Sequence, residues 1–500
     1  MTPPTSMPDS PLESTAPEAA PREPASAIDA SLRWPILALA TSAAAWLLAG
    51  LLLATIAAIK LHAPEFLASQ PWLTLGRVRP AALNCILYGF ASQAGFALAF
   101  WLLARLGGIR FPAALPTLAA YVLWNVAVTL GVGGILAGQS TGFAWLEMPR
   151  GAASLLLAAY ILLGIFALIT FQARTVRALY PTQWFVLGAL FAFPWAFGAA
   201  TQLLLADPVR GTLQAVINGW FTGVFSHLWL GGLALAALYY FLPRLANQPL
   251  HSSGLAAFAF WNLVFFGGFT GLTGLIGGPV PRWIPAVSGA ATVCLLLPLA
   301  CHLANWHLTV RGGRADALRG AWGSRPELGF LLVSVAACAL SGLLEAAFAF
   351  PQVADLLGLT YLGPARQALF LHGFIGAALL GALYVILPAV AGTTLPSPGL
   401  VRAHLHLTLA GLVLLVAGLA LGGVVQGLRL ADASVPFLTV VKGTTPFVGL
   451  STLGTTLLLL GQVCFLVQLG RLLRATCDTV CRPLWVFLGC CSPAKAGGKS

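Results

Sequence analysis

Twelve apolar segments of about twenty residues or more constrain this chain of 500 residues more than any other feature. Each segment is long enough to cross the ~30 Å hydrocarbon core of a bilayer as an α-helix. Unpaired backbone groups are very costly in lipid, so a helical bundle is the architecture open to such segments. We therefore predict an all-α polytopic membrane protein with twelve transmembrane helices, at residues 33–60, 81–106, 114–137, 152–173, 184–206, 216–243, 255–278, 286–310, 327–350, 367–390, 403–427 and 447–473.

The number and the distribution of charged residues indicate a membrane protein and not a nucleic-acid-binding one. Apolar residues make up 59% of the sequence and charged residues 8%, far fewer than a soluble chain carries. The net charge of +12 could suggest nucleic acid, but the basic residues concentrate in the tails and alternate loops, most densely at 311–325. That pattern is the positive-inside signal, which predicts that both termini are cytoplasmic. We expect the lipid bilayer as a partner and no nucleic acid.

The ends of the chain differ in composition from the apolar centre. The first residues are rich in Pro, Ser, Ala and Glu and lack the basic start of a cleaved signal peptide. We predict a disordered cytoplasmic tail at 1–32, a twelve-helix membrane domain at 33–474 and a second cytoplasmic tail at 475–500.

The sequence contains eight short motifs that are informative when they are considered together and in their order. They are "LGRVRP" (75–80), "YGFASQAG" (88–95), "FAFPWAFGAATQLLL" (191–205), "PVRGTLQAVINGW" (208–220), "LYYFLPRLANQPLHS" (238–252), "LIGGPVPRW" (275–283), "GALYVILP" (381–388) and "GGVVQG" (422–427). In sequence and order they resemble subunit I of the cbb3-type cytochrome c oxidases, in the haem–copper oxidase superfamily. The resemblance implies twelve helices, two haems, one copper, electron transfer from cytochrome c to oxygen, and proton translocation. It also implies a bacterial inner membrane and c-type cytochrome or other respiratory-complex subunits as partners.

The resemblance implies six ligating histidines and one tyrosine, and this chain has none of them at the matching positions. Counting from the motifs, the low-spin haem ligand position is Ala82 and the first copper ligand position is Gly223. The histidine pair before "LIGGP" is replaced by Thr273 and Gly274, and the tyrosine by Gly267. The H-x-H that ligates both haems is replaced by Arg366 and Ala368. Haem iron and copper need imidazole ligands, so we expect no cofactor at these positions and no oxidase activity.

Two of the remaining histidines lie one helical turn from a missing ligand. His227 follows position 223 by four residues, and His372 follows position 368 by four, about 6 Å along the same helix face. They could meet across an emptied cavity and bind one repurposed haem or metal. Alternatively, each is a buried histidine hydrogen-bonded to a hydroxyl or carbonyl group. We expect His302 and His307, by contrast, to have interfacial, hydrogen-bonded positions near a helix end.

Glu345 is the acidic residue placed well inside a predicted helix. A carboxyl group in the membrane is costly, which makes Glu345 a candidate proton relay. The alternative is a neutral carboxyl group hydrogen-bonded near Ser334 or Ser341.

The function with most support from the sequence is a non-catalytic member of the family that acts as a scaffold or assembly subunit of a respiratory complex. The alternatives are a proton-coupled transporter or channel that uses the vacated cavity, and a repurposed haem protein built on His227 and His372.

Overall fold

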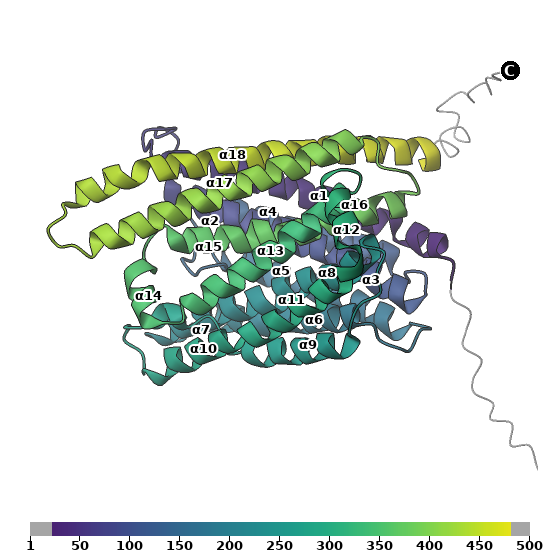
Figure 1. Ribbon diagram of the computed structural model, residues 1–500, viewed down its shortest axis with the longest axis horizontal. Helices are drawn as coiled ribbons and strands as arrows, with labels where there is room; N and C mark the ends of the chain where they lie inside the picture. Colours follow the sequence, from purple (N-terminus) through teal and green to yellow (C-terminus); the bar gives the residue numbers. More distant parts are fainter. Residues whose placement is uncertain (1–22, 482–500) are drawn as a thin grey trace, which may run out of the picture.

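The structure, a computed structural model, describes residues 23–481. Across that range the chain is a bundle of long, roughly aligned helices with no β-strand (Figure 1). Eleven helices are long and apolar enough to cross a membrane. A twelfth apolar helix, α9 (Ser253–Gly267), has 15 residues. The predicted all-α membrane fold is confirmed, while the count of twelve full spans is not.

Several spans are continuous runs of more than one element. They are α2–η2–α3 (Leu75–Asn84, Cys85–Ala91, Ser92–Gly107), α6–η3 (Pro181–Ala200, Thr201–Ala206), α7–η4–α8 (Leu213–Val224, Phe225–Leu230, Gly231–Leu245), α10–α11–η6 (Trp283–Cys294, Leu296–Val310, Arg311–Gly313), α15–η7–α16 (Leu362–Ala368, Leu369–Gly376, Ala377–Ala391) and α18–η8 (Phe437–Thr476, Cys477–Cys481). In five of these runs the η segment is a π-helical turn: η2, η3, η4, η7 and η8. Such turns are frequent at functional sites.

The other spans are single helices: α1 (Ala25–Lys60), α4 (Ala114–Leu136), α5 (Arg150–Gln172), α13 (Pro326–Ala347) and α17 (Pro398–Leu430). The short helices α12 (Arg314–Trp322) and α14 (Pro351–Leu357) lie in the connections. Helix α1 begins eight residues before the predicted start of the membrane domain. Most of the predicted tails, 1–22 and 482–500, fall outside the described residues.

Three spans form the centre of the bundle. The most apolar windows of Leu75–Gly107, Leu213–Leu245 and Leu362–Ala391 are 100%, 89% and 83% buried, against 33–50% for the other spans. The surrounding helices expose large apolar side chains such as Phe191 (66%) and Phe265 (64%). Lipid is the natural contact for such a surface. These central spans carry the π-helical turns η2, η4 and η7.

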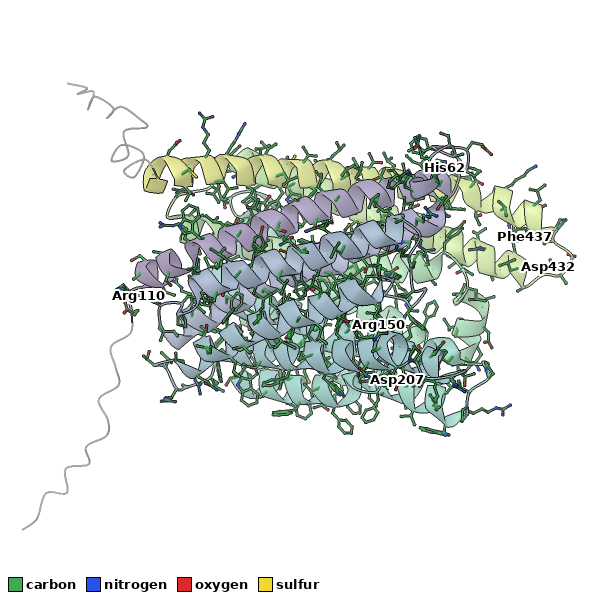
Figure 2. All side chains as sticks on the ribbon, turned by 180° about the vertical axis from the view of Figure 1, so that it is seen from behind. His62, Arg110, Arg150, Asp207, Asp432 and Phe437 are labelled. Atoms are coloured by element: carbon green, nitrogen blue, oxygen red, sulfur yellow. The ribbon has the colours of Figure 1, made fainter. Side chains whose placement is uncertain are left out.

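The last two long helices, α17 and α18, lie side by side as an antiparallel hairpin (Figure 1). Glycines let their backbones approach closely, since a Cβ at Gly411 would lie 2.7 Å from the carbonyl oxygen of Gly454. The start of α1 and the end of α18 lie at the same end of the bundle (Figure 1). Arg110 lies at that end, and His62 and Asp432 lie at the opposite end (Figure 2).

The predicted helix 255–278 is wrong in its second half. Helix α9 ends at Gly267, and residues 268–282 are non-helical apart from the 3₁₀ turn η5 (Thr273–Leu275). Gly271 (φ +93°) and Gly277 (φ +76°) adopt the left-handed conformation that glycine permits at little cost. The segment stays apolar although it leaves the helix, which is why hydropathy alone extended the helix too far.

Candidate functional site

A cavity of about 450 Å³ lies inside the bundle, between the span α7–η4–α8, helices α11 and α13, and the span α15–η7. This volume is within the usual range for small-molecule sites. The lining extends to Ala144 in the loop between α4 and α5, and to Gly274 in the non-helical segment after α9. Both of these residues are exposed, so the cavity reaches the surface at the end of the bundle away from the chain termini.

Four of the six predicted ligand positions line this cavity, namely Gly223, Thr273, Gly274 and Arg366. The register of the motifs therefore brings together residues from two spans and from the non-helical segment after α9. Ala82 and Ala368 do not line the cavity. Ala82 is buried in α2, and Ala368 is the last residue of α15. Gly267, the tyrosine position, packs against His227 and Leu228.

At Gly223 the neighbouring backbone occupies the space of a side chain. A Cβ at this position would lie 2.5 Å from the carbonyl oxygen of Thr270 and 2.7 Å from the backbone nitrogen of Gly271. One turn earlier, a Cβ at Gly219 would lie 2.8 Å from the carbonyl oxygen of Gly271. The non-helical segment after α9 is thus packed directly onto α7, and only glycine fits at 223.

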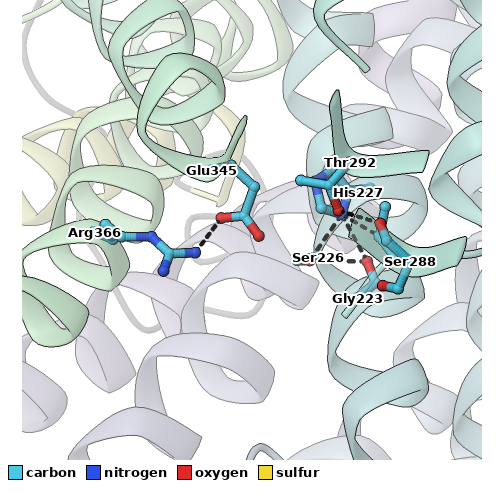
Figure 3. A network of polar contacts seen from close by, with 8 residues as sticks. Gly223, Ser226, His227, Ser288, Thr292, Glu345 and Arg366 are labelled. Carbon is cyan, nitrogen blue, oxygen red and sulfur yellow. Dashed lines mark hydrogen bonds and ion pairs between the residues drawn. The ribbon is translucent and has the colours of Figure 1, made fainter. Parts of the chain in front are cut away.

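Arg366 and Glu345 form an ion pair in the cavity, with 2.5 Å between Nη2 of Arg366 and Oε2 of Glu345 (Figure 3). The guanidinium carbon of Arg366 also lies 4.0 Å from the ring centroid of Phe348. Glu345 therefore pairs with an arginine, and not with Ser334 or Ser341, the partners named in the alternative to a proton relay. Ser334 instead donates a hydrogen bond to the carbonyl oxygen of Phe374 (2.8 Å).

His227 lines the same cavity, on the side opposite Arg366, with Glu345 between them (Figure 3). Its Nδ1 lies 2.9 Å from the carbonyl oxygen of Gly223. A carbonyl oxygen only accepts, so Nδ1 carries a hydrogen and donates it to Gly223. Nδ1 also lies 3.3 Å from the hydroxyls of Ser226 and Thr270.

The structure does not bring His372 to His227. His372 lines a separate small cavity of about 20 Å³, together with His404 and Gln462. That volume holds about one water molecule. His404 is hydrogen-bonded through Nδ1 to the hydroxyl of Tyr384, at 2.8 Å. The arrangement gives no shared site for two axial imidazoles.

Sequence reasoning missed the place of His302 in the cavity wall, while the hydrogen bond that we expected for it is present. His302 is 2% exposed, lines the main cavity, and is hydrogen-bonded through Nδ1 to the hydroxyl of Tyr239 at 2.8 Å. It shares one helix face with Pro298, Asn305 and Trp306, all of which are also buried. That spacing of three and four residues was a signal in the sequence for a buried face.

The residues present do not fit an iron–copper centre. Among residues 23–481, no group of three or more His, Cys, Asp or Glu could hold a metal ion. At Gly223 the backbone of Thr270 and Gly271 occupies the place of an imidazole, and at position 366 a cation stands in place of a neutral nitrogen ligand. The site contains the ion pair of Glu345 and Arg366, the side chain of His227 and apolar walls.

Comparison with known proteins gives a consistent result. The family described as "Cytochrome C and Quinol oxidase polypeptide I" matches residues 35–457. The chain is 26% identical over 396 residues to "Cbb3-type cytochrome c oxidase subunit CcoN1" of Stutzerimonas stutzeri, covering 77% of this chain and 81% of that relative. It is 25% identical over 450 residues to "Cytochrome c oxidase subunit 1 homolog, bacteroid" of Bradyrhizobium diazoefficiens, covering 86% and 80%. It is 23% identical over 433 residues to "Cytochrome c oxidase subunit 1 homolog" of Azorhizobium caulinodans, covering 84% of this chain and 78% of that relative.

Proposed function

The chain belongs to the cytochrome c and quinol oxidase polypeptide I family, as a divergent subunit I of the haem–copper oxidase type, and on that premise we propose that it is a non-catalytic member. Its role is that of a scaffold or assembly subunit in a respiratory membrane complex. It keeps the helical bundle of the family and has given up oxidase chemistry.

The observation that carries this proposal is the backbone contact at Gly223. Haem–copper chemistry requires imidazole ligands in the centre of the bundle. A histidine at 223 cannot be accommodated while Thr270 and Gly271 lie against α7. The backbone path itself therefore excludes a ligand at position 223. This supports a non-catalytic protein better than the absence of a few side chains alone would.

The relatives support the choice of partners and compartment. They are named as subunits of cytochrome c oxidases, and two of them cover more than 80% of this chain. We propose that the chain contacts c-type cytochrome subunits or other respiratory subunits in a bacterial inner membrane. The distribution of Lys and Arg supports cytoplasmic termini.

A second candidate function rests on the cavity itself. Glu345 and Arg366 lie within a membrane-embedded cavity that reaches exposed residues, and ionisable groups in such places commonly serve transport or proton transfer. A proton-coupled transporter or channel would use Glu345 as its proton-carrying group.

The deciding experiment is a reduced-minus-oxidised absorbance spectrum of the purified full-length chain, together with oxygen consumption and the identity of co-purifying subunits. We expect no Soret band, no oxygen uptake with reduced cytochrome c, and co-purification of respiratory subunits. A ligand-bearing relative purified in the same way is the positive control.

Other outcomes separate the alternatives. Haem with oxygen uptake would refute the proposal. Haem without oxygen uptake, lost in His227→Ala or His372→Ala, would favour a repurposed haem protein. A colourless chain that purifies alone would refute the scaffold role and leave the transporter.

A further inference from the structure

The main cavity combines an arginine with unused hydrogen-bond donors and long apolar walls. Its apolar lining includes Leu235, Leu263, Leu295, Leu299, Phe370 and Phe374. Arg366 uses Nη2 for the contact with Glu345, and the structure gives its other guanidinium nitrogens no hydrogen bond within residues 23–481. A guanidinium group presents five donors in a planar fork that matches a carboxylate. Nε is enclosed by protein, so Nη1 is the nitrogen of that fork that is still open to a ligand.

Three polar atoms in the cavity walls lack partners among the described residues: Nε of Arg366, Oγ of Ser341 and Nε2 of His302. A buried polar atom without a partner is costly, and such atoms call for an explanation. His302 is itself 98% buried, since only 2% of it is exposed. The guanidinium group of Arg366 needs a hydrogen-bond acceptor, and the hydroxyl of Ser341 needs a polar partner. The oxygen atoms of a ligand would serve both.

Helix α13 presents one continuous face to the cavity. Ser341 and Gly342 follow Cys338 by three and four residues, and Glu345 follows them by four and three, so all four lie on the same side of the helix. The face runs from Cys338, which is buried, to Glu345 at the Arg366 end. A ligand with its polar end at Arg366 would therefore lay its tail along α13 toward the apolar residues of α8 and α11.

From these observations we propose that the cavity binds a small amphipathic carboxylate, a molecule with one acidic group and an apolar tail. Arg366 anchors the carboxylate, Ser341 donates a hydrogen bond, and the tail lies against the leucines and phenylalanines. Glu345 competes with the ligand for Arg366. The inference goes beyond the scaffold role and does not depend on it.

The competition between Glu345 and the ligand predicts linkage to protons. Two carboxylates at one guanidinium group repel each other, so binding the ionised ligand favours a protonated Glu345. The titratable and charged groups facing Glu345 are Arg366 from α15, His227 from η4, and Cys338 and His302 farther along the cavity. Of these, Arg366 makes the direct ion pair. Glu345 is therefore the group expected to take up the proton.

The test uses radiolabelled decanoate, with the full chain in lipid nanodiscs, and empty nanodiscs as the background. We expect saturable binding that weakens by up to about tenfold per pH unit between about pH 6 and 8, where decanoate stays ionised. Decanol has the same tail and no charge, so it should compete at least about tenfold less well.

Two variants separate this proposal from non-specific uptake. Glu345→Gln frees Arg366, so decanoate should bind about tenfold more tightly and without pH dependence. The double variant Glu345→Gln, Arg366→Gln keeps the cavity neutral and similar in shape, and it should lose at least about tenfold in affinity relative to Glu345→Gln. The double variant avoids leaving a buried carboxylate unpaired, so a loss there is not a folding failure.

Three results would overturn the proposal: equal competition by decanol, weaker binding in Glu345→Gln, or pH dependence that persists in that variant. Weaker binding in Glu345→Gln would mean that Glu345 supports the binding site and does not compete with decanoate for Arg366. None of these results bears on haem content or co-purifying subunits, so the scaffold proposal is tested separately.

Discussion

Gly223→Ala tests most directly whether the neighbouring backbone excludes a side chain at position 223, which the motif register predicts to match the first copper ligand of the family. The new Cβ would lie 2.5 Å from the carbonyl oxygen of Thr270, 2.6 Å from its carbonyl carbon and 2.7 Å from the nitrogen of Gly271. All three atoms belong to backbone, so no side chain can rotate away. Accommodating the methyl group requires the segment after α9 to move off α7.

The expected cost is the balance of two effects. Overpacking of this kind costs about 1–3 kcal/mol, and contact with three backbone atoms places Gly223→Ala near the upper end. Alanine is favoured over glycine inside a helix by about 1 kcal/mol, which acts in the opposite direction. We therefore expect the free energy of unfolding to fall by about 2 kcal/mol.

Gly274→Ala is the matched control, because it also lies at a family ligand position. A Cβ at Gly274 would meet nothing within 4 Å. Its stability should therefore change by less than about 0.5 kcal/mol. The measurement is loss of helix on titration with SDS in mixed micelles, followed by far-UV circular dichroism. Equal stability of the two variants would refute the idea that backbone packing excludes a side chain at 223.

Two further predictions concern buried polar pairs. Burial raises the pKa of Glu147, which lies in the loop between α4 and α5 and accepts a hydrogen bond from Nδ2 of Asn84 at 2.8 Å. A raised native pKa means that stability falls as pH rises from the ordinary glutamate value through the native one, because the unfolded carboxyl group loses its proton first. Glu147→Gln should remove this slope and stabilise the chain at pH 8 by about 1 kcal/mol, and an unchanged slope in SDS titrations would contradict the assignment. Tyr384→Phe should cost about 1–3 kcal/mol, because Nδ1 of the buried His404 loses its partner. Tyr121→Phe is its control, since within residues 23–481 the Tyr121 hydroxyl makes no hydrogen bond, and equal Tm values for the two variants would count against a structural role for the pair.

Hydropathy predicted most of the membrane helices, because an apolar run of sufficient length has few alternatives in lipid. It failed at 268–278, where the residues remain apolar but glycines such as Gly271 let the backbone leave the helix. Hydropathy measures transfer into lipid, and it does not register the conformational freedom of glycine. The one long apolar segment that is not a full helix is therefore the one where glycine is dense.

The site was predicted in part. The motif register placed Gly223, Thr273, Gly274 and Arg366 together, and the structure puts all four on one cavity. The partner of Glu345 could not be read, because Arg366 is 21 positions away on another span and no local pattern joins them. The separation of His227 from His372 was equally hidden. A spacing of four residues gives the position of each histidine along its helix. Which cavity that position lines depends on how the helix packs against the other spans.

The end of α9 at Gly267, the glycine at 223 and the arginine at 366 are structurally connected. With the second half of the α9 span unwound, Thr270 and Gly271 lie on α7, and only a residue without Cβ can face them. Arg366, at the position that the motif register predicts for a haem ligand, is a cation, and Glu345 pairs with it in the cavity. Placing histidines at 223, 273 and 274 would consequently not be expected to create a copper site by itself, because positions 273 and 274 lie in the 3₁₀ turn η5 and not in an α-helix. A helix carrying histidines at 273 and 274 would require residues 268–278 to be helical, which the five glycines at 268, 271, 274, 277 and 278 oppose.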